Sequence, residues 1–279
     1  MLLLRILSRT PLFILYLFSD LLFVVSYYLV GYRKKLVRKN LKNSFPQKSE
    51  AEIRQIEKQF YHNLCDYAVE TLKLLTIQKD DLLARVKFVN PEIPQKLISE
   101  GKTVLMLASH QFNWEWLLAA GSNYFTVLDF VYQPQSSALF NAFSLAGRTR
   151  FGAYPIKRQM VGRESITRKS LVRGIALVAD QFPGMGYDKK YWTTFLNQRT
   201  AFYQAISQLA VLLQCPVLFM GVRKVKRGYY EAEYELIDEP PYEKGSDRII
   251  DNYVKATEKI IQAQPGGWLW SHNRWKDRK

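Results

Sequence analysis

Short apolar runs and amphipathic segments alternate along most of the chain. The apolar runs predict buried strands, which we place at residues 86–90, 103–109, 126–132, 174–179 and 216–222. Helical periodicity predicts helices at residues 49–75, 91–100, 114–121, 138–147, 164–173, 201–213 and 247–263. Residues 229–237 alternate between apolar and polar positions and predict an antiparallel edge strand. This order predicts an α/β fold, a mostly parallel central sheet flanked by helices.

The first apolar stretch, residues 11–30, differs from the others because it is long enough to cross a bilayer, which needs about 20 residues. Ser19, Asp20 and Ser26 weaken this interpretation, since an aspartate at mid-membrane costs about 3 kcal/mol. A helix that lies in the membrane interface, or a deeply embedded hairpin-like helix, is the alternative to a full crossing. We therefore expect an N-terminal membrane-anchoring helix within residues 1–32 and a separate domain at residues 33–279.

The chain is strongly basic, with a formal net charge of +15, and this excess requires an acidic partner. Charge alone does not decide whether this partner is nucleic acid, anionic lipid, or an acidic protein or substrate. One basic cluster, residues 33–42, follows the apolar stretch and contains no acid, so the positive-inside rule places the body of the protein in the cytoplasm. A second cluster, residues 147–173, has one acid, Glu164. Cys65 and Cys215 are expected to be buried free thiols.

Candidate chemistry is concentrated where the predicted strands end. His110 ends the apolar run at 103–109, Asn113 stands at the N-cap position of the next helix, and Glu115 lies on its first turn. A carboxylate there can fold back on the imidazole and fix its tautomer. Gln133, Asp180 and Gln181 also follow strands, and parallel strand ends meet at one edge.

Two observations weigh against giving His110 a catalytic role on spacing alone. His272 also has an acid five positions later, at Asp277, in a basic and Trp-rich tail. A histidine at a strand end is also commonly a hydrogen-bonded structural residue. The gathering of polar residues at strand ends favours His110 over His272 as the functional histidine.

Several sequence blocks together resemble the bacterial lipid A biosynthesis (late) acyltransferases of the lysophospholipid acyltransferase superfamily. The blocks are the apolar N-terminus followed by Arg38-Lys-Asn-Leu41 and Phe45-Pro46, His110 with Asn113-Trp114-Glu115, Arg148-x-Arg150-x-Gly152, Ala179-Asp180-Gln181, and residues 268–276. Ser109 stands where the glycerolipid branch has Asn, which favours the lipid A branch. Phe112 replaces the usual Gly before Asn-Trp-Glu. The resemblance implies a glycerolipid-acyltransferase-like fold.

The resemblance also implies a reaction, transfer of a fatty acyl chain from acyl carrier protein, or from acyl-CoA, to a hydroxyl of a lipid A precursor. His110 is then the general base and Glu115 orients it, with direct attack and no acyl-enzyme. Backbone N–H groups near Asn113 would stabilise the oxyanion. Arg148 and Arg150 would bind acceptor phosphates, with helix-end dipole partners as their alternative role. Asp180 and Gln181 would support the site.

The implied partners are acyl carrier protein, docking on the basic residues 157–173, a membrane glycolipid acceptor and anionic inner-membrane lipids, with no nucleic acid, cofactor or metal. The implied location is the bacterial inner membrane, with the catalytic domain on the cytoplasmic side. Acylation of a lysophospholipid or an aminolipid is an alternative reaction. A non-catalytic basic membrane-binding module is an alternative of another class, and it leaves the polar strand ends unexplained.

Overall fold

A seven-stranded sheet forms the centre of the molecule. The computed structural model describes residues 1–184 and 189–276. The strand order is β1-β9-β8-β2-β5-β3-β4, and every neighbouring pair is parallel except β8 and β9. The strands are β1 (Val86–Phe88), β2 (Val104–Ala108), β3 (Leu128–Tyr132), β4 (Tyr154–Lys157), β5 (Gly174–Val178), β8 (Val217–Lys226) and β9 (Tyr229–Asp238). The predicted α/β class and mostly parallel sheet are confirmed.

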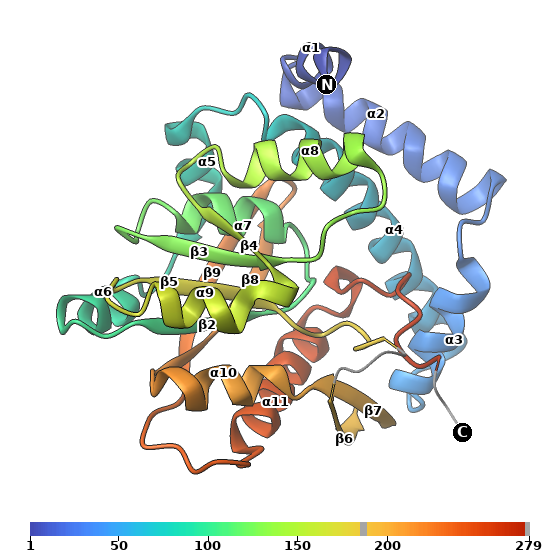
Figure 1. The fold of residues 1–279 in the computed structure, drawn as a ribbon. Coiled ribbons are helices and arrows are strands. Elements are labelled where there is room, and N and C mark those ends of the chain that lie inside the picture. Colours follow the sequence, from blue (N-terminus) through green and yellow to red (C-terminus); the bar gives the residue numbers. More distant parts are fainter. Residues whose placement is uncertain (185–188, 277–279) are drawn as a thin grey trace.

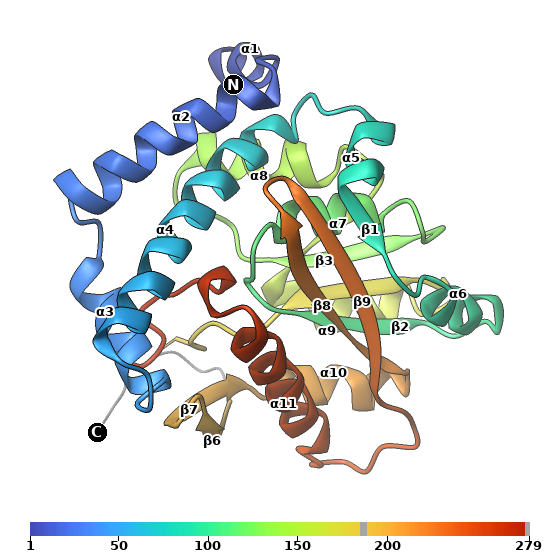
Figure 2. The same cartoon turned by 180° about the vertical axis from the view of Figure 1, so that it is seen from behind.

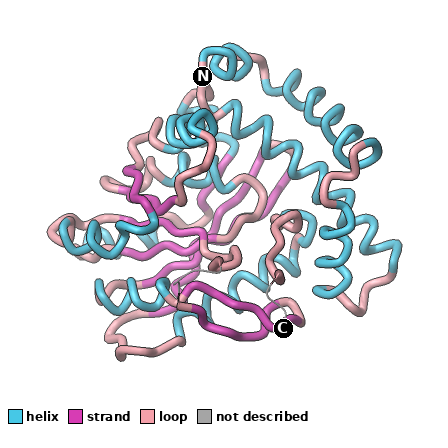
Figure 3. Tube along the Cα trace, turned by 45° about the vertical axis from the view of Figure 1, so that its right-hand side comes forward, coloured by secondary structure: helices cyan, strands magenta, loops and turns pink. Residues whose placement is uncertain are grey.

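Helices cover both faces of this sheet, which Figure 3 shows as a central layer. All five residues of β2 are buried because alternate side chains enter two different cores. Leu105 and Leu107 pack on the side of α10 (Ala205–Leu213) and α11 (Arg248–Ala263). Met106 and its neighbours pack on the side of α5 (Lys79–Arg85), α6 (Glu92–Ser99) and α7 (Trp114–Gly121). A strand buried on both faces therefore reads as a continuous apolar run.

The N-terminal helices lie along one side of the body. α1 (Leu2–Ser8) precedes α2 (Leu12–Val24), which continues as a π-helical turn (Val25–Leu29). α3 (Lys34–Ser44) and α4 (Glu50–Lys73) follow, and α2 lies alongside α4 in Figures 1 and 2. By length and composition Leu12–Leu29 is the one candidate membrane span among the described residues, and 28% of it is buried against the protein. The expected apolar N-terminal helix is present, packed on the body by one face.

The second half of the chain departs most from the predicted elements. Residues 201–203 end a hairpin of β6 (Lys190–Phe195) and β7 (Gln198–Tyr203), so the predicted helix at 201–213 begins only at Ala205. The two-residue turn Leu196-Asn197 has positive φ at both positions, as a type I′ hairpin requires. Asn197 is common in this geometry and Leu196 is not. The turn therefore lacks the usual sequence signal, and the sequence did not predict the hairpin.

Three smaller predictions also need correction. Strand β4 lies inside the basic stretch at 147–173, and the helix predicted at 164–173 is α9 (Val161–Thr167), which ends earlier. Strand β9 is antiparallel as predicted, but it is internal because β1 pairs with its outer side. The remaining helix, α8 (Ala138–Arg148), lies as predicted. Asp277, the acid spaced from His272, falls outside the described residues.

Candidate active site

His110 follows β2 at the carboxyl edge of the sheet, and Asp180 holds its imidazole. Nδ1 of His110 lies 2.6 Å from Asp180 Oδ1, and the backbone N–H of His110 donates to Oδ2 at 2.9 Å. The indole N–H of Trp268 donates to the same Oδ2 at 2.6 Å. Asp180 follows β5, which pairs in parallel with β2, so sheet register brings His110 and Asp180 together. The predicted convergence of strand-end polar residues is confirmed for this pair.

The charge of Asp180 fixes the tautomer of His110. Burial acts to raise the pKa of the Asp180 carboxyl, but the imidazole and the hydrogen bonds outweigh burial and hold this pKa below its usual value. An ionised carboxylate at Nδ1 keeps a proton there, which leaves Nε2 as the basic nitrogen. The side-chain amide of Gln181 lies 3.2 Å from Nε2 and donates to it in this tautomer.

Glu115 is bound by an arginine rather than by the imidazole. Arg148 donates from Nε to Oε2 at 2.7 Å and from Nη2 to Oε1 at 2.6 Å, a bidentate pair. The indole N–H of Trp114 donates to Oε1 at 3.2 Å, and the Tyr67 hydroxyl does so at 3.4 Å. Within the described residues, the carboxylate that contacts the His110 ring is Asp180. We expected Glu115 to orient His110, and the structure gives that contact to the residue expected only to support the site.

Trp114 links the two carboxylate pairs. Its ring meets the His110 ring edge-on, with centroids 4.9 Å apart, and stacks on Tyr67 at 4.2 Å. Its indole N–H donates to Glu115. The Glu115–Arg148 pair therefore limits the movement of an aromatic wall beside the imidazole, without touching the imidazole itself.

Asn113 caps α7, as its position in the sequence predicts. Its side-chain oxygen accepts from the Trp116 N–H at 2.9 Å, and its amide donates to Oε2 of Glu70 at 2.7 Å. Asn113 is 1% exposed, so its side chain serves the helix start rather than a ligand. The first helical amides, those of Trp114 and Glu115, have no acceptor within the helix. These N–H groups lie four and five positions after His110 in the chain and are suited to an anionic oxygen.

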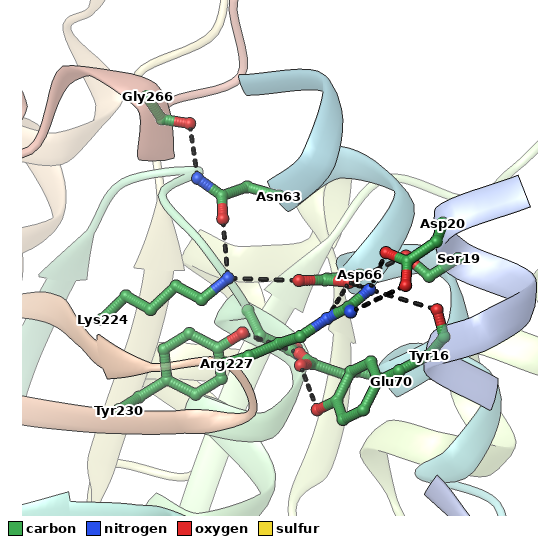
Figure 4. A network of polar contacts seen from close by, with 11 residues as sticks. Tyr16, Ser19, Asp20, Asn63, Asp66, Glu70, Lys224, Arg227, Tyr230 and Gly266 are labelled. Atoms are coloured by element: carbon green, nitrogen blue, oxygen red, sulfur yellow. Dashed lines mark hydrogen bonds and ion pairs between the residues drawn. The ribbon is translucent and has the colours of Figure 1, made fainter. Parts of the chain in front are cut away.

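Glu70 is a central residue of the polar network behind α7, shown in Figure 4. Its carboxylate accepts from Tyr16 of α2 and from Tyr230 of β9, each at 2.8 Å, as well as from Asn113. Burial raises the pKa of Glu70, and the hydrogen bonds oppose this effect. The sequence analysis missed Glu70, because no motif marks a buried acid in the last turn of a long helix.

Arg148 and Arg150 do not form a common clamp. Arg148 is engaged with Glu115, while Arg150 Nη1 donates to the backbone carbonyls of Leu74, at 3.1 Å, and Ile77. The two side chains line different cavities. Their predicted joint role at an acceptor phosphate has no support in this arrangement, and Arg150 instead binds the end of α4.

A cavity of about 460 Å³ opens beside His110. Its polar wall includes Tyr67, His110, Trp114, Glu115, Arg148 and Gln181. Its apolar wall includes Leu117, Leu118, Phe130, Val178, Leu209 and Met220. One polar end with a base and one apolar interior suit a ligand that carries a reactive group on a hydrocarbon.

His272 lies near this region in a different role. Its Nε2 accepts from the backbone N–H of Phe182 at 3.2 Å, and burial lowers its pKa to about 4. Such a histidine is neutral at pH 7 and fastens the C-terminal segment to the loop after β5. Trp268, from the same tail, contacts Asp180 directly. Among the described residues, no group of three or more His, Cys, Asp or Glu side chains could hold a metal ion.

Comparison with known proteins adds the family. The model of the bacterial lipid A biosynthesis acyltransferase family matches residues 1–277. No curated protein matches the sequence. A solved structure, the 1-acyl-sn-glycerophosphate (LPA) acyltransferase PlsC from Thermotoga maritima, is similar with 14% identity and a TM-score of 0.41, covering 96% of this chain and 98% of that one. The family match spans nearly the whole chain, so this protein belongs to the bacterial lipid A biosynthesis acyltransferase family.

Proposed function

We propose that the protein transfers a fatty acyl chain from the thioester of acyl carrier protein, or of acyl-CoA, to a hydroxyl of a lipid A precursor. The family supports acyl transfer. The observation that carries the mechanism is the contact between Asp180 and Nδ1 of His110, a residue that lines a largely apolar cavity. We further propose that the reaction takes place at the cytoplasmic side of the bacterial inner membrane, since an apolar helix precedes a basic cluster.

In the proposed step, Nε2 of His110 removes the proton of the acceptor hydroxyl as its oxygen attacks the thioester carbonyl carbon. A C–O bond forms, and collapse of the tetrahedral intermediate breaks the C–S bond. His110 then returns the proton to the departing sulfur. Asp180 stabilises the imidazolium between these transfers. Gln181, which occupies the Nε2 position, must yield to the acceptor hydroxyl.

Two groups have supporting roles in this proposal. The N–H groups of Trp114 and Glu115 stabilise the negative oxygen of the intermediate. Glu115, held by Arg148, is a positioning residue that keeps Trp114 against the imidazole. The apolar interior of the cavity, with Leu117, Phe130 and Met220 among its lining, takes hydrocarbon of the acyl donor.

The docking site proposed for acyl carrier protein is smaller than the basic stretch 157–173. Arg168 and Arg173 both bind Asp129, at 3.0 and 2.7 Å, so they are not free for a partner. Lys157, Arg163 and Lys169 are exposed. These three cations are offered to an acidic donor protein.

The test is substitution of His110 by alanine. A folded His110→Ala protein should lose acyl transfer by a factor of about 10³ or more, since it lacks the base. His62→Ala is the matched control, because His62 is exposed and stacks on Phe23 of α2. Mass spectrometry of lipid A from a deletion strain identifies the acceptor. Normal turnover by folded His110→Ala protein would contradict the mechanism, and unchanged lipid A would contradict the acceptor.

A further inference from the structure

A second concave site lies next to the N-terminal helices, away from His110. It has a volume of about 390 Å³ and is lined by Arg9, Lys73, Leu75, Thr76, Gln78 and Arg150. Three of these six residues are cationic and none is acidic. We refer to this site as the basic pocket. Its walls come from the link between α1 and α2, the end of α4 with the segment after it, and the segment after α8.

The basic pocket is held open by hydrogen bonds between its walls. Lys73 Nζ donates to the carbonyls of Ser8 and Thr10, each at 3.1 Å, and the Thr76 hydroxyl donates to Ser8 at 2.5 Å. Arg150 Nη1 donates to carbonyls at the end of α4. These bonds use only part of each cation's capacity, because an ammonium has three N–H donors and a guanidinium five. Donors therefore remain for a ligand in a site that needs little reorganisation.

The charges of the pocket are not neutralised within the protein. In residues 1–184 and 189–276, no ion pair involves Arg9, Lys73 or Arg150. Asp81, the acid that acts on Lys73 from a distance, is paired with Arg85 at 2.7 Å. Burial lowers the pKa of both Lys73 and Arg150. Partly desolvated cations without a carboxylate partner are unfavourable, and a bound anion would relieve that cost.

The surroundings indicate where such an anion would come from. α1, which leads into the pocket, exposes large apolar side chains, namely Leu2, Leu3, Ile6 and Leu7, and α2 exposes Phe13 and Leu17. A group of large exposed apolar side chains on two consecutive helices indicates contact with a membrane or another protein. Cations beside apolar residues match the boundary between headgroups and acyl chains. A soluble anion would leave the apolar surface uncovered.

We propose that the basic pocket binds the phosphate of a membrane phospholipid headgroup, while the exposed side chains of α1 and α2 enter the acyl region of the same leaflet. This inference goes beyond the proposed acyl transfer, because it concerns a lipid that is bound and not converted. Arg150, expected at an acceptor phosphate near His110, then binds phosphate in a different place. The pocket fixes the depth and orientation of the full-length protein on the membrane.

The test measures binding of the purified full-length protein to vesicles of phosphatidylcholine alone and with about one-third phosphatidylglycerol. Neither vesicle contains an acyl donor or acceptor, so the result is independent of acyl transfer. For the unmodified protein, the anionic lipid should strengthen binding. In Arg9→Gln/Arg150→Gln this enhancement should fall about thirtyfold, since each of the two lost contacts is worth about 1 kcal/mol. Arg9→Lys/Arg150→Lys should recover part of it.

The matched control is Lys96→Gln/Lys244→Gln, which removes the same charge. Both lysines are exposed, and Lys96 lies on α6, on the far side of the body from α1 in Figures 1 and 2. This control should keep the enhancement within about twofold. Equal losses in both double variants would show general charge attraction and overturn the pocket. Binding of inorganic phosphate to the pocket, with vesicle enhancement unchanged in the arginine variants, would overturn the lipid as its source.

Discussion

Two carboxylates lie near the imidazole, and each is held by a different partner. Asp180 is in direct contact with His110, whereas Glu115 is neutralised by Arg148. Asp180 is therefore poised to stabilise charge that develops on the imidazole. Glu115 already has a full charge partner before the reaction begins, so it has little left to offer the base. The residue spacing H-x4-E marks the loop, but the acid that acts on the base comes from the neighbouring strand.

Substitution of the two acids should separate these roles. Asp180→Asn should lower kcat about 10²- to 10⁴-fold with little change in KM, because the imidazole loses its tautomer control and its counter-charge. Glu115→Gln should lower kcat less and reduce the melting temperature more, because breaking a buried ion pair costs about 3–5 kcal/mol. Steady-state kinetics and thermal unfolding of both variants give the comparison. A larger kcat loss in Glu115→Gln at unchanged melting temperature would return the orienting role to Glu115.

The sequence predicted His110 and its place at a strand end, because a buried strand followed by a helix N-cap is a local pattern. It predicted that polar residues at strand ends would meet at one edge, but it did not identify Asp180 as the partner of His110. That contact depends on β2 and β5 being neighbours in register, which is a property of strand order. The same holds for Trp268, whose indole reaches Asp180 from the C-terminal tail. The sequence also misled for Arg148. Its position near the predicted site suggested that it binds a ligand, but its partner is the buried Glu115.

Helix α2 is bound to the body by polar contacts as well as by packing. Arg227, at the turn between β8 and β9, pairs with Asp20 of α2 at 2.7 Å and with Asp66 of α4 at 2.7 Å. Ser19 of α2 donates to Asp66, also at 2.7 Å. Figure 4 shows these side chains gathered between α2, α4 and the hairpin. Asp20, which weakens the interpretation of a full membrane crossing, thus has a partner in the protein.

These contacts alter the expectation for removal of the N-terminus. If residues 33–279 form a separate domain, deletion of residues 1–30 leaves a folded α/β core. It would expose the surfaces now covered by Leu12, Leu15, Phe23 and Tyr27, each worth about 1.5–3 kcal/mol at most. That total is comparable with the whole stability of a domain. We therefore expect the deletion to abolish cooperative thermal unfolding in detergent, measured by circular dichroism.

Two variants serve as controls for the deletion. Removal of residues 1–9 takes away α1, in which only Ser8 is buried, and should retain a cooperative transition. Asp20→Asn should cost only about 0.2–1 kcal/mol, because Asp20 and Arg227 are both substantially exposed. An unchanged melting temperature for residues 31–279 would restore the view of a separable anchor.

At the scale of the whole molecule, the net charge of +15 overstates the charge available to partners. Within the basic cluster at 33–42, Arg38 pairs with the buried Glu57 at 2.8 Å, and Arg33 donates to the Ser271 carbonyl. Arg168 and Arg173 are likewise used inside the protein. The cations of the stretch 157–173 that remain exposed, Lys157, Arg163 and Lys169, are those assigned to the donor protein. The acidic partner that the composition predicts stays a prediction, and these few exposed cations are the positions where we expect it to bind.

Charge reversal at the proposed donor dock tests that assignment. Lys157→Glu/Lys169→Glu should raise the KM for acyl carrier protein thioesters about tenfold or more at low salt, since each reversal costs about 1 kcal/mol of attraction. kcat should change little, because neither lysine lines the cavity at His110. Lys96→Glu/Lys244→Glu carries the same charge change away from the dock and should leave this KM within about twofold. The difference should shrink in about 0.5 M salt, where screening is strong. If the dock variant and the control showed the same KM at low salt, the donor would bind elsewhere on the molecule.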